Sequence, residues 1–136
     1  MRIPSRPEFA VRVREEAFRR ALQAGFPTPE AEDVALAVHE AVINAIEHGN
    51  QSDPTRVVAV TFVDDSSALV IEVRDEGTAR DSEPSAGGPL PSAGAPRGRG
   101  IPLMRALMDD VQLFPERGRV TLRRRKPSSA GATDGG

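Results

Sequence analysis

The chain has 136 residues, a net charge of −2 and no cysteine. This length suits one domain with a hydrophobic core, and the lack of cysteine excludes disulfides and thiolate metal sites. Aromatic residues make up only 4% of the chain, Trp and Tyr are absent, and no apolar run stands at the amino terminus, so we expect a cytoplasmic protein without a nucleic-acid or membrane partner.

The first two predicted elements are helices joined by a rigid break. Residues 8–24 carry apolar side chains at spacings near three and four, which predicts an amphipathic helix that ends near Gly25. Prolines interrupt the pattern over residues 26–30, where Thr28 is a candidate N-cap and Pro29 suits the first helical position. The second helix is predicted to run from about Pro29 to residue 48.

Polar side chains gather on one side of this second helix. At 100° per residue, the valines and alanines share one face, while Glu40, Asn44, Glu47 and His48 lie roughly opposite. The spacing of Glu40 and Asn44 places a carboxylate and an amide within reach of one bound cation or one reacting group, for which Mg²⁺ with phosphates is the natural ligand. The alternative is a solvated polar face closed by Gly49 at the helix C-cap.

A β-hairpin is expected after the second helix. Residues 56–63 and 68–74 are rich in β-branched side chains and flank a polar turn. Within the second of these segments, Leu69, Ile71 and Val73 alternate with other residues and are expected to face the core.

Two further strands are expected near the carboxyl end. Residues 119–125 alternate in the same way, with Val120 and Leu122 facing inward and Thr121 outward. Residues 111–114 form a candidate fourth strand. The length of the chain leaves one α+β or all-α domain as the expectation.

A long segment rich in Gly, Pro, Ser and Ala, residues 78–100, separates the strands. It holds too few large apolar residues for a packed element, and loops of this length in a compact domain are usually lids, binding loops or disordered segments. Gly98 and Gly100 stand at its end, just before Pro102 can begin a helix. Backbone N–H groups at such a helix start can approach a phosphate.

Charged residues flank both ends of this segment. Arg97 and Arg99 can add positive charge beside the glycines, although each alone is more typical of a solvated surface. Asp75 follows an apolar strand and precedes a turn, so its carboxylate can accept a hydrogen bond from an exocyclic amine such as that of adenine. The alternative is a turn carboxylate that caps its own backbone.

Three segments, in this order, resemble motifs of the GHKL ATPase superfamily, which includes gyrase, histidine kinase and MutL-type ATPase domains. Residues 40–49, Glu-Ala-Val-Ile-Asn-Ala-Ile-Glu-His-Gly, resemble its N box, and residues 73–77, Val-Arg-Asp-Glu-Gly, resemble its adenine-binding first glycine box. Residues 98–111, which begin Gly-Arg-Gly-Ile-Pro-Leu, resemble its phosphate-binding second glycine box, and residues 118–124 resemble its closing strand. Within the superfamily, the chain is most similar to the anti-sigma factor serine/threonine-protein kinases of bacterial partner-switching systems.

The resemblance also implies a fold. It implies an α+β domain of the Bergerat ATPase type, a two-layer α/β sandwich with a mixed, mostly antiparallel sheet and helices on one face. One domain would cover residues 1–125, with an ATP lid at about 78–100, and residues 126–136 would form a disordered tail.

The sequence departs from the pattern of the superfamily or of its serine-kinase relatives in two places. The second glycine of the first glycine box is missing, since Ala79 follows Thr78, and the serine-kinase relatives tolerate this. The amino-terminal strand often found in these kinases is expected to be short or absent around Ile3.

The resemblance assigns roles to residues of the three boxes. Asn44 would ligate Mg²⁺, Glu40 would be the general base or orient the nucleophile, and Asp75 would bind the adenine amino group. His48 would contact a phosphate or the lid, or would cap the helix. The further nucleotide-binding positions implied are Gly77, Arg97, Gly98, Arg99, Gly100, Ile101 and Thr121.

The resemblance implies a function as well. It implies an ATP-dependent serine/threonine protein kinase, using ATP and Mg²⁺, that phosphorylates an anti-anti-sigma partner of the STAS type and sequesters a sigma factor. The alternative is a nucleotide-binding regulatory module without kinase activity. A homodimer is a further expectation from the family.

Overall fold

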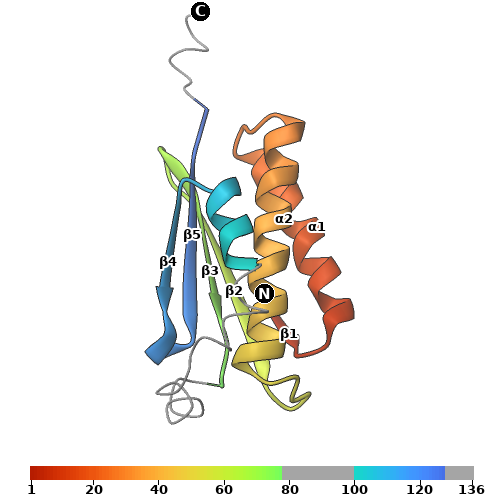
Figure 1. Ribbon diagram of the computed structural model, residues 1–136. Coiled ribbons are helices and arrows are strands. Elements are labelled where there is room, and N and C mark those ends of the chain that lie inside the picture. Colours follow the sequence, from red (N-terminus) through yellow and green to blue (C-terminus); the bar gives the residue numbers. More distant parts are fainter. Residues whose placement is uncertain (78–99, 128–136) are drawn as a thin grey trace, which may run out of the picture.

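Helices cover one face of a β-sheet in the computed structural model, which describes residues 1–77 and 100–127 (Figure 1). The α+β fold predicted above, a two-layer sandwich with helices on one face, is confirmed. In chain order the elements are β1 (Arg2–Pro4), α1 (Pro7–Gln23), α2 (Thr28–Asn44), η1 (Ala45–Gly49), β2 (Val57–Asp64), β3 (Ala68–Arg74), a helix at residues 100–107, β4 (Asp110–Phe114), η2 (Pro115–Arg117) and β5 (Arg119–Arg125).

The sheet has the strand order β1-β2-β3-β5-β4, and each pairing between these described strands is antiparallel. The predicted hairpin is confirmed as β2 and β3, with Phe62 opposite Ile71. The amino-terminal strand β1 is present but short, and it pairs with β2 at the edge of the sheet, where the amino group of Met1 donates to the Val60 carbonyl at 2.7 Å. Because β3 lies at the centre, its carboxyl end is held between β2 and β5.

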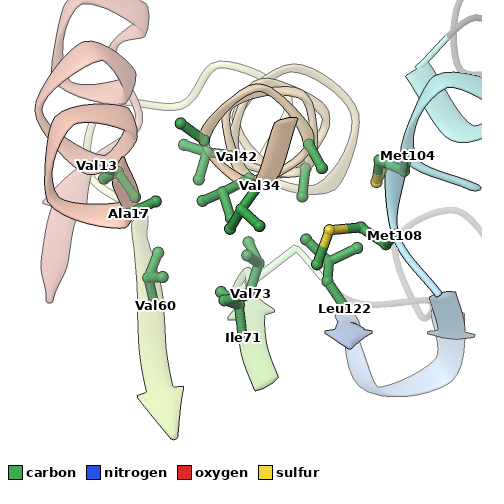
Figure 2. Packing of buried hydrophobic residues seen from close by; sticks show 14 of the residues in the cluster. Val13, Ala17, Val34, Val42, Val60, Ile71, Val73, Met104, Met108 and Leu122 are labelled. Carbon is green, nitrogen blue, oxygen red and sulfur yellow. The ribbon is translucent and has the colours of Figure 1, made fainter. Parts of the chain in front are cut away.

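Apolar side chains from the helices meet the inward face of the sheet in one cluster (Figure 2). Val34 of α2 points toward the sheet, whereas Val42 lies on the side of α2 that faces α1. Met104 and Met108 extend this cluster over β5. The residues predicted to face the core from β3 and β5 include four that are at most 1% exposed, namely Leu69, Ile71, Val73 and Leu122.

The start of α2 differs from the prediction that Thr28 is its N-cap. Pro27 occupies the cap with an extended backbone, Thr28 is already helical, and no side chain caps this end. Pro29 still lies in the first turn. The N–H groups of that turn have no acceptor within the helix, so proline is tolerated at its second position as well as its first.

The end of α2 also differs from a single continuous helix. The α-helix ends at Asn44, and residues 45–49 form the wider π-helical turn η1, in which the Asn50 N–H donates to the Ala45 carbonyl at 2.7 Å. Wider turns of this kind are frequent at functional sites because they rotate the residues that follow. Here the turn redirects Gly49 and Asn50 toward the end of β3.

The helix predicted to begin at Pro102 already includes Gly100 and Ile101. Proline needs only a place in the first turn, so this earlier start costs no hydrogen bond. In the described part of the chain, no helix has the length and apolar character needed to cross a membrane.

Two valines of the hairpin test the predicted core. Val73→Ala removes two methyl groups from a side chain that is 1% exposed, whereas Val63→Ala removes the same groups from a side chain that is 50% exposed. We expect Val73→Ala to lower the free energy of unfolding by about 2 kcal/mol and Val63→Ala by about 0.5 kcal/mol or less. Urea denaturation measures both, and equal losses would contradict this packing.

Candidate functional site

The polar side of α2 meets the start of the helix at residues 100–107. Glu40 and Asn44 lie one turn apart, and both are half-buried. A Cβ atom at Gly100 would lie 2.8 Å from Nδ2 of Asn44 and 3.4 Å from Oε1 of Glu40. The absence of a side chain at Gly100 therefore lets its backbone pack against both polar groups. The structure brings the predicted Glu40 and Asn44 pair together with the last glycine of the second glycine-box segment.

The carboxylate of Asp75 lies between two glycine backbones at the end of β3. A Cβ at Gly49 would lie 2.0 Å from Oδ2 of Asp75, and a Cβ at Gly118 would lie 2.5 Å from Oδ1. The backbone N–H of Asp75 also donates to the Gly118 carbonyl at 2.8 Å. The end of η1 and the start of β5 thus fix the side chain that was predicted to recognise adenine.

Gly77 locks the turn after β3 onto the end of η1. A Cβ at Gly77 would lie 1.6 Å from the Gly49 carbonyl oxygen and 2.6 Å from Nη1 of Arg56. Any larger residue would push these two backbone segments apart. The segments that resemble the N box and the first glycine box are therefore in direct backbone contact.

Asn50 joins these same segments through its side chain and is fully buried, at 0% exposed. Its Oδ1 atom accepts hydrogen bonds from the backbone N–H groups of Glu76 at 2.7 Å and Gly77 at 2.8 Å. Its Nδ2 atom donates to Oγ of Ser5 at 2.8 Å and to the Val57 carbonyl at 3.2 Å. Asn50 is missing from the sequence-based predictions because an asparagine after a glycine is typical of an ordinary turn.

Three further predicted positions lie in the described part of the chain. His48 is half-buried within η1, and Ile101 is half-buried and packs against the hydrophobic cluster. Thr121 lies on the sheet face away from the helices, since it pairs with Glu72 while the adjacent Leu122 points into the core. Strand alternation therefore separates Thr121 from Glu40 and Asn44.

Part of the predicted site lies outside the described residues. These positions are Arg97, Gly98 and Arg99, together with residues 78–99 of the predicted lid.

His39 is a titratable neighbour of Glu40 that the motifs do not include. Its Nδ1 atom is buried, forms no hydrogen bond to the described residues, and lies 4.0 Å from Oε2 of Glu40. Burial lowers the pKa of His39 below its usual 6.5, the positive charge of Arg14 lowers it further, and Glu40 opposes the shift. His39 is therefore held in its neutral form beside the polar pair.

Comparison with known proteins gives a family and several relatives. The family model described as the histidine kinase-like ATPase domain matches residues 3–124. The anti-sigma F factor of Clostridium acetobutylicum is 34% identical over 123 residues, covering 84% of this chain and 85% of that protein. The serine-protein kinase RsbW of Bacillus subtilis is 31% identical over 120 residues, covering 83% of this chain and 75% of that protein. RsbW of Listeria monocytogenes serotype 4a is 29% identical over 125 residues, covering 87% and 80%.

The lowered pKa of His39 makes a prediction about stability. The imidazole of His39 binds a proton less readily in the folded protein than in the unfolded chain. Neutral His39 therefore contributes fully to the free energy of unfolding above the pKa of the unfolded chain, near 6.5, and this contribution falls as the pH drops below that value. Urea unfolding from about pH 7.5 to about pH 5 should show a steeper loss in the unsubstituted protein than in His39→Gln. Parallel curves for the two proteins would contradict the assigned shift.

Proposed function

We propose that this chain, which belongs to the histidine kinase-like ATPase family, is an ATP-dependent serine/threonine protein kinase. Its substrate would be a serine of an anti-anti-sigma protein of the STAS type, and the kinase would otherwise sequester a sigma factor. The observation that carries the proposal is the contact of Gly100 with Glu40 and Asn44, which joins a candidate base, a candidate metal ligand and a helix start.

ATP would bind across the segments that meet at the end of α2. The carboxylate of Asp75, fixed between Gly49 and Gly118, would accept a hydrogen bond from the adenine amino group. The helix start at Gly100 offers backbone N–H groups and positive partial charge to phosphate oxygens. A Cβ at Gly100 would crowd Asn44 and Glu40, so the glycine keeps this helix start beside the two polar side chains that would face the phosphates.

Mg²⁺ would be held by Asn44 together with phosphate oxygens and water. The described residues contain no group of three or more His, Cys, Asp and Glu side chains able to hold a metal ion. Mg²⁺ commonly binds through one or two carboxylates plus substrate phosphates and water rather than in an all-protein cage, and here the amide oxygen of Asn44 would stand in for a carboxylate. When bound, the ion would neutralise charge on the phosphates during transfer. We therefore expect metal binding that depends on the nucleotide.

Glu40 would act on the attacking serine hydroxyl. Its carboxylate is half-buried one turn before Asn44, so one helix face presents both the base and the metal ligand. Phosphoryl transfer depends mostly on positioning and on charge stabilisation, and an oriented carboxylate can accept the hydroxyl proton. No covalent enzyme intermediate is needed.

The names of the relatives support the assignment of substrate and partner classes. One relative is called an anti-sigma F factor and others are called serine-protein kinases, and each matches over most of this chain. A cytoplasmic location and a homodimer accord with such a role and belong to the same proposal.

The kinase proposal is tested by replacing Glu40. Glu40→Gln keeps the size of the side chain but removes the proton acceptor, so transfer of labelled phosphate from ATP to a STAS-type partner should fall by about 100-fold or more. ATP binding, measured by calorimetry, should stay within about threefold, since a base acts mainly in the transition state.

Glu32→Gln is the matched control, because Glu32 is an exposed carboxylate on the same helix. It should transfer phosphate like the unsubstituted protein. Equal transfer by Glu40→Gln and Glu32→Gln would overturn the assignment of the base. Tight ATP binding by the unsubstituted protein without phosphate on any serine of the partner would favour a regulatory module without kinase activity.

A further inference from the structure

The amide of Asn50 connects the turn after β3 to two other parts of the fold. We propose that Asn50 is a positioning residue for base recognition, whose Oδ1 atom holds this turn so that the Asp75 carboxylate faces the adenine amino group. The inference rests on the proposed function, because it takes Asp75 as the group that binds adenine. Asn50 itself would not touch the nucleotide.

The backbone of the Asp75 turn is held on both sides. On one side, the N–H of Asp75 donates to the Gly118 carbonyl at 2.8 Å. On the other, the next two N–H groups, of Glu76 and Gly77, both donate to Oδ1 of Asn50. A turn with three consecutive N–H groups engaged has little freedom to shift, so the Asp75 side chain leaves the backbone in one direction.

The position of Asn50 is itself set by the end of α2. Its N–H closes the π-helical turn onto the Ala45 carbonyl at 2.7 Å, one residue after Asn44. Gly49, in the same turn, packs against the Asp75 carboxylate. Asn50 therefore links the end of α2, which holds the proposed metal ligand Asn44, to the turn that holds Asp75, the proposed adenine-binding residue.

An amide suits this place because it accepts and donates at once. A carbonyl oxygen can accept two hydrogen bonds and an amide nitrogen can donate two, and Asn50 uses all four while fully buried. A carboxylate there would keep the two accepted bonds and lose the two donated ones. An alanine would lose all four and leave buried N–H groups unsatisfied.

The donor side of Asn50 offers a control that leaves the Asp75 turn alone. Oγ of Ser5 accepts from Asn50 and donates to the Arg56 carbonyl at 2.7 Å, and Ser5 is buried at 3% exposed. Ser5→Ala therefore removes two hydrogen bonds at the amino-terminal segment without removing either bond to the turn. Comparison with Ser5→Ala therefore distinguishes a general loss of stability from a specific loss of adenine recognition.

The test compares the binding of Mg-ATP and Mg-GTP by calorimetry, because guanine has a carbonyl oxygen where adenine has its amino group. In the unsubstituted protein and in Ser5→Ala, ATP should bind more tightly than GTP by the same ratio. In Asn50→Ala, the dissociation constant for ATP should rise about tenfold while that for GTP changes by less than about twofold. An unchanged ratio in Asn50→Ala would overturn the inference alone.

A second variant covers the case in which Asn50→Ala does not fold. Asn50→Asp keeps the oxygen that accepts from Glu76 and Gly77, so its ATP-to-GTP ratio should stay within about twofold of the unsubstituted value even if its stability falls. Loss of the ratio in Asn50→Asp would contradict the role given to Oδ1. Failure of the unsubstituted protein to bind ATP would overturn the proposed function, and this inference with it.

Discussion

Helix α2 is packed against α1 on one side and against β3 and β5 on the other, and this burial is the constraint on which the site depends. Its buried residues are all Ala or Val, so the helix can approach its neighbours closely, and only one narrow side remains for polar groups. Glu40 and Asn44 occupy that side. Rotation of α2 about its axis would expose valines and bury a carboxylate, and both changes are unfavourable, so the core fixes the direction in which these two side chains point.

Contacts between backbones then fix the rest of the site relative to α2. Gly49 and Gly118 enclose the Asp75 carboxylate, and Gly100 abuts the polar side of α2. Asn50 joins the turn after β3 to the end of the same helix through buried hydrogen bonds. A phosphoryl-transfer site works by holding groups in place, so a site assembled from close backbone contacts around one rigid helix suits that chemistry.

The sequence predicted the parts of this structure whose signals are local and periodic. The spacing of apolar residues predicted the two helices, and the alternation along β3 predicted that Ile71 and Val73 are buried. Three motifs in the same order as in the family predicted the family. Asn50 carries no periodic signal, because its partners Ser5 and Gly77 are 45 and 27 residues away in sequence. The change from α-helix to π-helical turn at Ala45 was also not predicted, and Gly49 in that turn packs against Asp75 and Gly77, which are distant in the sequence.

A calorimetric titration of ATP with and without Mg²⁺, repeated for Asn44→Ala, tests the central claim that α2 holds a metal-nucleotide site. The account predicts that Mg²⁺ strengthens ATP binding by about tenfold or more in the unsubstituted protein and that this gain is lost in Asn44→Ala. Asn44→Asp, which keeps an oxygen ligand, should retain a gain from Mg²⁺. Absence of ATP binding, or the same gain from Mg²⁺ in Asn44→Ala as in the unsubstituted protein, would contradict the account.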